Sequence, residues 1–200
     1  MDTLALPISS ISSSPDGLSN ILEPECNLAI WEREPLSGLA ELLEARPSDI
    51  RFTTKLKELP RMLSAQLEAQ GFPDLPGRAA LMDDIVRLSV QYCDILRLDE
   101  VEVRLEVVTT NSCRKWHADF VTARLITTYI GTGTQWLDAQ DAERVRDGKE
   151  PSEINSLKAG ATGIFKGKLA TDFPAIHRSP PIEGTGDARL LLVLNPADSN

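Results

Sequence analysis

The sequence predicts an α+β fold, in which helices of the N-terminal half pack against one side of an antiparallel sheet or barrel formed by the C-terminal half. Apolar residues recur at helical spacing before residue 98, and they alternate with polar residues after it. The chain has 200 residues, of which 42% are hydrophobic and 26% are charged. That length and composition suit one globular domain with a sizeable core.

The chain divides into three regions within one structural domain. Residues 1–35 form an N-terminal extension, residues 36–98 a helical layer and residues 99–200 a strand-rich core. The extension is interpreted as a loosely organised lead-in, because residues 9–14 are rich in serine and Pro-Asp-Gly follows as a turn signal. Within it, residues 27–31 could form a short strand.

Three helices are predicted in the middle region. In the first, Leu39, Leu42 and Leu43 fall at helical spacing after Ser37, a possible N-cap. The second covers residues 53–70, and Pro60 is expected to kink or interrupt it. The third is long and amphipathic, with polar residues between the members of one apolar stripe. The stripe consists of Leu81, Ile85, Leu88, Tyr92 and Leu96. Such a stripe is typical of a helix face that packs on the core.

The C-terminal half predicts strands. Residues 101–110 alternate between apolar and polar side chains, which is the pattern of a half-buried strand. Further strands are expected at residues 120–130, 161–165, 174–177 and 188–195. The polar and charged segment 138–153 is interpreted as a surface loop or a short helix.

The net charge, the apolar runs and the cysteine content limit which binding partners and which cellular compartment we expect. The formal net charge of −9 argues against binding to a phosphate backbone as a main task. No apolar run approaches the roughly 18–20 residues that cross a bilayer, and the first residues lack the basic start of a signal peptide. Three widely spaced cysteines argue against a disulfide scaffold. We therefore expect a cytoplasmic protein without nucleic-acid or membrane partners.

Both histidines of the chain lie in the strand-rich half, and one of them belongs to an HxD pattern. On an extended strand His117 and Asp119 point to the same face, so both could reach one metal ion. His177 lies in a later predicted strand. Two imidazoles and one carboxylate make the facial triad of non-haem Fe(II), which leaves neighbouring positions open for a bidentate co-substrate and O₂.

Arg189 stands at the start of an apolar strand, where a charged side chain needs a partner. The fork of a guanidinium suits a carboxylate, so an acidic co-substrate bound to the metal could provide that partner. Arg124 is expected either to line the same cavity or to pair with an acidic residue.

Cys113 leaves a second interpretation of the metal open. If the chain is extended from residue 113 to residue 119, Cys113 shares a face with His117 and Asp119. A thiolate added to the two imidazoles and the carboxylate would make a closed tetrahedral set that suits Zn²⁺. A closed set is typical of a structural or storage site, because it has no open position for a substrate.

The order HxD, a long gap, His and then Arg resembles the Fe(II)/2-oxoglutarate-dependent oxygenases over roughly residues 100–196. The segments CRKWHADFVTARLITTYIGTGTQWL and GIFKGK…AIHRSPPIEGTGDARLLLVLNP look more closely like the bacterial family called domain of unknown function 1826. That family is often discussed beside zinc-homeostasis genes, which is in keeping with a non-catalytic zinc-binding protein as the alternative function.

The oxygenase resemblance implies a C-terminal double-stranded β-helix, a cupin-like jelly roll on which the N-terminal helices pack. It implies that Fe(II) is bound by His117, Asp119 and His177; Cys113 is a possible fourth ligand only in the zinc alternative, which rests on strand geometry. It also implies that Arg189 holds the distal carboxylate of 2-oxoglutarate and that Tyr129 donates a hydrogen bond to it. Many such oxygenases have Ser or Thr two residues after the arginine.

In this chain that position is Leu191, which has no hydroxyl, and Lys166 could provide a substitute cation for the co-substrate. The substrate of the oxygenase that the resemblance implies would be a small molecule or a protein.

Overall fold

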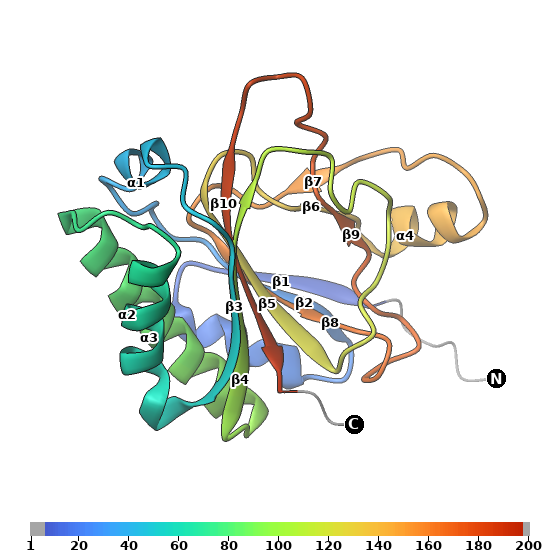
Figure 1. Ribbon diagram of the computed structural model, residues 1–200. Coiled ribbons are helices and arrows are strands. Elements are labelled where there is room, and N and C mark those ends of the chain that lie inside the picture. Colours follow the sequence, from blue (N-terminus) through green and yellow to red (C-terminus); the bar gives the residue numbers. More distant parts are fainter. Residues whose placement is uncertain (1–6, 198–200) are drawn as a thin grey trace.

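A seven-stranded main sheet forms the centre of the computed structural model, which describes residues 7–197 (Figure 1). Its strands are β1 (Ile8–Ser12), β2 (Cys26–Trp31), β3 (Ile50–Lys55), β4 (Glu100–Val108), β5 (Ala123–Ile130), β8 (Thr162–Lys166) and β10 (Arg189–Pro196). They lie in the order β1-β2-β8-β5-β10-β4-β3. All neighbours are antiparallel except β1 and β2, which are parallel.

A smaller sheet lies on the other side of the main sheet from the long helices (Figure 1). It contains β6 (Gln135–Trp136), β7 (Asn155–Ser156) and β9 (His177–Arg178), in the order β7-β6-β9. An isolated antiparallel bridge pairs His117 with His177 and so adds one more segment beside β9. From β4 onward, the chain therefore passes back and forth between the two sheets.

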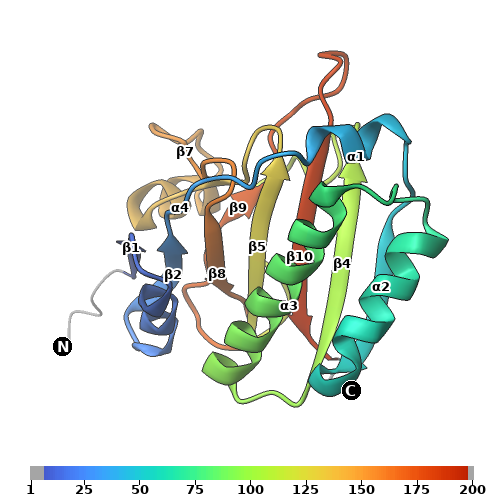
Figure 2. The same ribbon diagram turned by 90° about the vertical axis from the view of Figure 1, so that its left-hand side faces the viewer.

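The helices α1 (Ala40–Glu44), α2 (Leu59–Ala69) and α3 (Pro76–Leu96) cover one face of the main sheet, and α3 runs across its central strands (Figure 2). A fourth helix, α4 (Ala139–Arg146), lies on the other side, beside the smaller sheet (Figure 1). Two 3-10 turns, η1 (Pro15–Leu22) and η2 (Leu56–Glu58), complete the helical elements of the described residues. The long amphipathic helix is confirmed as α3, and four of its five stripe residues are fully buried. Within residues 7–197, none of the helices combines the length and the apolar character that a membrane span needs.

The alternation of side chains along each strand divides the core between the two faces of the main sheet. On β10, Leu190, Leu192 and Leu194 pack toward the helices. Leu191 and Val193 pack into a second cluster with residues of the smaller sheet. Because both faces of β10 are covered, nearly the whole strand is apolar, as expected for a central strand.

The predicted helix over residues 53–70 is corrected by the structure. Residues 50–55 form β3, which pairs with β4 at the edge of the main sheet. The helix begins only at Leu59, so Pro60 lies in its first turn rather than in its middle. A proline is well tolerated there because the first amides of a helix have no intrahelical partner.

The N-terminal region also differs from the predicted loose lead-in. Residues 8–31 contribute β1, η1 and β2, and β2 pairs with β8 in the main sheet. The strands β1, β2 and β3 therefore precede the long helices, and the large sheet draws on both halves of the chain. Residues 1–6 of the predicted extension and residues 198–200 of the predicted core lie outside the described residues.

A buried ion pair anchors α3 to the main sheet. Asp84 on α3 is only 4% exposed, and Arg33 donates two hydrogen bonds to its carboxylate, at 2.6 and 2.8 Å. Tyr129 on β5 donates a third at 2.8 Å, and Arg87 also pairs with the carboxylate. Burial raises the pKa of Asp84, but Arg33 outweighs that effect and holds the pKa below its ordinary value.

We predict that Asp84→Asn lowers the free energy of unfolding by about 3 kcal/mol, because it leaves a buried guanidinium without its counter-ion. Chemical denaturation at pH 7 measures this loss. Since the folded-state pKa of Asp84 is lowered, its contribution is complete above an ordinary pKa of about 3.9 and is lost as the pH falls further. The difference between wild type and variant should therefore shrink in strong acid.

The exposed pair of Arg61 and Glu58, 3.3 Å apart, provides the control for this prediction. Glu58→Gln should change the free energy of unfolding by less than about 1 kcal/mol. Equal losses in the two variants would contradict the assignment of Asp84 as the anchor.

Candidate metal centre and buried arginine

Three side chains from separate parts of the sequence converge between the two sheets. His117, Asp119 and His177 each offer one ligand atom, and these atoms all lie within 4.8 Å of one another. Nε2 of His177 is 3.2 Å from Oδ2 of Asp119, and Nε2 of His117 is 3.7 Å from Oδ1 of Asp119. The group fits the HxD…H pattern found in the sequence, and its ligand atoms are close enough to share one ion.

Backbone pairing brings the two histidines together. The His117 amide donates to the His177 carbonyl at 3.0 Å, and the His177 amide donates to the His117 carbonyl at 2.9 Å. Asp119 is held by the loop after β8, whose Lys168 amide donates to the Asp119 carbonyl at 2.9 Å. Gly167 permits this close approach, because a Cβ there would lie 2.8 Å from the same carbonyl.

Both imidazole rings are oriented by backbone carbonyls. Nδ1 of His117 lies 2.9 Å from the carbonyl of Lys115, and Nδ1 of His177 lies 3.0 Å from the carbonyl of Ala175. A carbonyl can only accept, so each Nδ1 carries a proton, and a ring in its neutral form has its lone pair on Nε2. Metal-binding histidines are commonly fixed in this way.

Only one of the two carboxylate oxygens of Asp119 accepts a hydrogen bond from the described residues. Arg124 donates to Oδ1 at 2.6 Å, whereas Oδ2 is buried and accepts no hydrogen bond from the described residues. Nε2 of His177 lies 3.2 Å from that same oxygen, so a proton or a metal ion can lie between them. With neither, two buried acceptors would be in contact, which is unfavourable. The donor set of two nitrogens and one carboxylate therefore fits a divalent transition metal.

The electrostatic surroundings favour the protonation states that a metal needs. Burial raises the pKa of Asp119, but His177, Arg124 and His117 together hold it below its ordinary value. Burial and the neighbouring His177 lower the pKa of His117. At neutral pH the carboxylate is therefore ionised and the His117 ring is uncharged.

Arg124 forms an ion pair with an acidic side chain. From the sequence it was expected either to do this or to line the cavity. It contacts Asp119 and also donates from Nε to Oδ1 of Asn195 at 2.7 Å. Asn195 donates to Glu102 at 2.6 Å, and Arg51 at the sheet edge pairs with Glu102 at 2.6 Å. A connected series of polar side chains thus runs across β5, β10, β4 and β3. Its contact with Asp119 is made by Arg124, which holds the carboxylate in place.

Arg189 is fully buried, yet all of its partners are neutral. Nε donates to the Thr132 carbonyl at 2.6 Å, and Nη1 donates to the Ser179 hydroxyl at 3.0 Å. Nη2 lies 3.2 Å from the Thr128 hydroxyl and 3.4 Å from that of Thr134. Among residues 7–197, no carboxylate forms an ion pair with this guanidinium.

Burial lowers the pKa of Arg189 to about 10, which reflects the cost of holding its charge away from water. Gly131 packs against the arginine, since a Cβ at that glycine would lie 3.0 Å from the Arg189 Cγ. Its φ of +85° also favours glycine. The guanidinium is thus a buried charge whose partners are one carbonyl and three hydroxyls.

Two residues expected near the anion lie elsewhere. Tyr129 faces the helices, where its hydroxyl donates to Asp84 at 2.8 Å. The Lys166 ammonium donates to the carbonyl of Glu23 at 2.6 Å. The side-chain alternation of β5 and β8 explains both placements, because Tyr129 and Lys166 occupy strand positions that point away from the smaller sheet.

Cys113 does not join the group of metal-ligand candidates. Its thiol is exposed, and the backbone turns at this residue with a φ of +53°. The extended run from residue 113 to residue 119, which would have aligned the thiol with His117, is therefore interrupted. The three-residue group is the open arrangement rather than the closed tetrahedral one.

Sequence analysis missed the hydroxyls around Arg189. Thr128 lies four residues after Arg124 on β5, and Ser179 lies two residues after His177, so both positions have the parity of a residue already singled out. That parity was available in the sequence. Nothing local indicated Thr134 or Asn195, because their contacts depend on pairing between distant segments.

Comparison with known proteins identifies the family of this chain and the fold that it shares with solved structures. A family model described as protein of unknown function (DUF1826) matches residues 12–195. The sequence matches no curated protein.

Among solved structures, the fold is similar to AtDAO1, a dioxygenase for auxin oxidation from Arabidopsis thaliana in complex with 2-oxoglutarate. The TM-score is 0.57 at 10% identity, covering 98% of this chain and 95% of that chain. A Shewanella oneidensis protein provisionally described as an oxygenase has a TM-score of 0.52 at 12% identity, covering 94% of this chain and 89% of that one. These likenesses show a shared fold.

We predict that Arg124→Gln weakens Co²⁺ binding by roughly 10–100-fold, because Asp119 then loses the partner that orients its carboxylate. Arg124→Lys should retain part of the affinity, since it keeps the charge. Competition with a coloured chelator measures the dissociation constants. Arg51→Gln, at the far end of the same polar chain, is the control and should bind Co²⁺ like wild type; unchanged affinity in Arg124→Gln would refute the role.

Proposed function

We propose that this chain, which belongs to the DUF1826 family, is a mononuclear non-haem Fe(II) oxygenase that uses 2-oxoglutarate. One observation carries the proposal. The buried Oδ2 of Asp119 accepts no hydrogen bond from the described residues and faces Nε2 of His177, with His117 beside them. A cation bound between these atoms satisfies all three ligands at once.

The three ligands suit a catalytic metal rather than a closed structural one. His117, Asp119 and His177 would occupy one side of the ion and leave its other positions open. When bound, Fe(II) supplies the redox chemistry that couples oxidative decarboxylation of 2-oxoglutarate to oxidation of a second substrate. The protein orients the ligands through the Lys115 and Ala175 carbonyls and through Arg124.

Arg189 provides the second support for the proposal. A carboxylate placed at its guanidinium would neutralise a buried charge that now has only neutral partners. The hydroxyls of Thr128, Thr134 and Ser179 accept from this arginine and can turn their own protons toward the same anion. They take the place of the hydroxyl that Leu191 lacks.

The path of the chain supports a double-stranded β-helix for the core that we place at residues 99–200. Its strands alternate between the main and the smaller sheet, and the metal-ligand candidates come from segments that face the interior. The similarity to AtDAO1, whose structure contains 2-oxoglutarate, supports the choice of co-substrate.

We predict that the protein, prepared without oxygen and loaded with Fe(II), converts 2-oxoglutarate to succinate when air is admitted. His117→Ala and His177→Ala should each abolish metal retention and succinate formation, because two ligands cannot hold the ion tightly. Metal analysis and succinate assay measure both. Tight zinc retention without turnover would overturn the oxygenase and would favour the zinc-binding alternative.

We predict that Arg189→Gln weakens 2-oxoglutarate binding by at least about tenfold, because it removes a charge-assisted hydrogen bond to the anion in a dry site. Calorimetry on the metal-loaded protein without oxygen measures the affinity. Arg178→Gln provides the matched control, since Arg178 bonds Gln135 at 2.7 Å and stacks on Trp116 instead. Equal affinity in wild type and Arg189→Gln would exclude this co-substrate site.

A further inference from the structure

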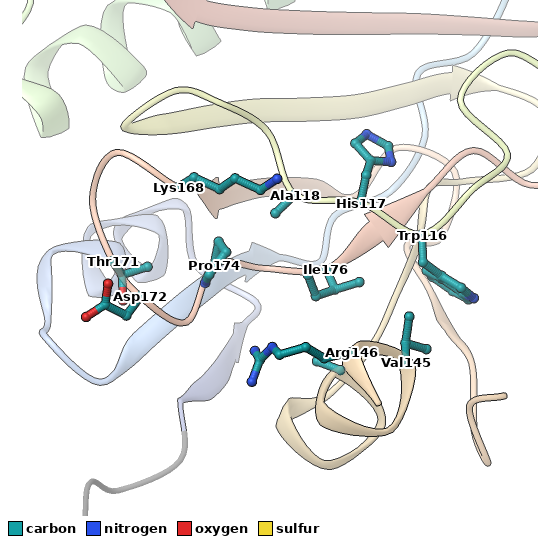
Figure 3. A pocket seen from close by; sticks show the side chains of 11 residues that line it. Trp116, His117, Ala118, Val145, Arg146, Lys168, Thr171, Asp172, Pro174 and Ile176 are labelled. Carbon is teal, nitrogen blue, oxygen red and sulfur yellow. The ribbon is translucent and has the colours of Figure 1, made fainter. Parts of the chain in front are cut away.

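A cavity of about 520 Å³ lies on the far side of the paired segment that carries the histidines (Figure 3). Its walls come from α4, from residues 116–118, and from the loop and strand over residues 168–176. The volume falls within the range of pockets for small organic ligands. It is also larger than the space that a few ordered waters would fill.

The cavity borders the metal group at one residue. His117 contributes to the lining, whereas Asp119 and His177 do not. Along an extended segment, Trp116 and Ala118 point to the side opposite His117 and Asp119. Figure 3 shows the His117 ring directed away from the side on which Trp116, Val145 and Arg146 lie. A molecule bound there would therefore contact the segment that carries His117 from the side opposite its ring.

The charges around this cavity differ from those of the whole chain. The protein carries a formal charge of −9, yet the cavity is lined by two basic side chains, Arg146 and Lys168, and by one acidic side chain, Asp172. Within residues 7–197, neither basic group forms an ion pair with an acidic one. Figure 3 shows Lys168 and Arg146 on opposite sides of Pro174 and Ile176.

The remaining walls are apolar and partly fixed in place. Trp116, Pro174 and Ile176 offer apolar surface between the two cations. The Arg178 guanidinium lies 4.2 Å from the centre of the Trp116 ring, which holds the indole against the strand. The Arg146 guanidinium lies 5.9 Å from the centre of the Phe173 ring and is restrained in the same manner. An apolar floor between two cations matches a ligand with an apolar body and an acidic group.

We propose that this cavity is a second binding site, specific for a small organic anion with an apolar body. Arg146 and Lys168 attract the acidic group, and Trp116, Pro174 and Ile176 receive the body. The site stands on its own cavity and charges, so it does not require the proposed oxygenase function. Ala118 lies between two metal-ligand candidates and lines the cavity, so a bound anion would touch the strand that carries them.

The test uses the full-length protein, freed of metal with a chelator and then desalted, so that carboxylates cannot coordinate an ion. Calorimetry compares 4-ethylbenzoate with 4-ethylbenzyl alcohol, which has the same body without the charge, and with acetate, which lacks the body. We expect 4-ethylbenzoate to bind most tightly. Arg146→Gln and Lys168→Gln should each raise its dissociation constant by roughly threefold to fivefold, because the lost charge contacts are partly exposed.

Three variants make the outcome specific. Arg146→Lys should retain most of the affinity, since it preserves the charge. Arg144→Gln is the matched control on the same helix, where Arg144 bonds the Glu150 carbonyl at 3.1 Å, and it should bind like wild type. Arg189→Gln should also leave the affinity unchanged. Unfolding curves establish that every variant is folded.

Three results would overturn the proposal. Equal affinity for the alcohol and the carboxylate would mean that charge has no part in binding. If Arg189→Gln lowered the affinity for 4-ethylbenzoate and Arg146→Gln did not, the anion would bind in the interior, at the site proposed for 2-oxoglutarate. The absence of heat up to millimolar 4-ethylbenzoate would leave the cavity without the proposed ligand class.

Discussion

A two-residue antiparallel bridge is the constraint on which the rest of the site depends. The amides and carbonyls of His117 and His177 bond each other at 3.0 and 2.9 Å, and they join segments that lie far apart in the sequence. With this pairing, the imidazoles and the Asp119 carboxylate share one space. Without it, the HxD motif would be a local feature with no third ligand. The bridge is short, and β6 extends it on the other side of β9, where Trp136 pairs with His177.

Two buried aspartates differ in how completely their carboxylate oxygens are satisfied. Asp84 accepts hydrogen bonds from two arginines and a tyrosine, so both of its oxygens are satisfied and it anchors α3. Asp119 has one oxygen bound by Arg124 and one that accepts nothing from the described residues. A comparable contrast separates Arg33, which pairs with Asp84, from Arg189, which has only neutral partners. A buried carboxylate oxygen without a hydrogen-bond donor and a buried guanidinium without a counter-ion are both costly to maintain.

Because side chains alternate along a strand, neighbouring residues of one strand contribute to different sites. Around residue 117, one face carries the metal-ligand candidates, and Trp116 and Ala118 on the other face line the cavity next to α4, which His117 also borders. On β5, Arg124 and Thr128 face the interior, whereas Tyr129 faces the helices. One strand therefore contributes to the polar site and to the helix-packed core together, and a shift of one residue in register would exchange the two sets.

Local periodicity in the sequence by itself determined the elements whose signal lies within one segment. It predicted α3, β4, β10 and the shared face of His117 and Asp119, because a helix or strand repeats its contacts every few residues. Long-range pairing decided the rest. Only the tertiary structure shows that residues 50–55 form an edge strand and that Tyr129 bonds Asp84. It alone shows that Cys113 lies away from the metal-ligand candidates and that Arg189 is surrounded by hydroxyls. These outcomes depend on which distant backbone lies alongside, and no short window of sequence contains that information.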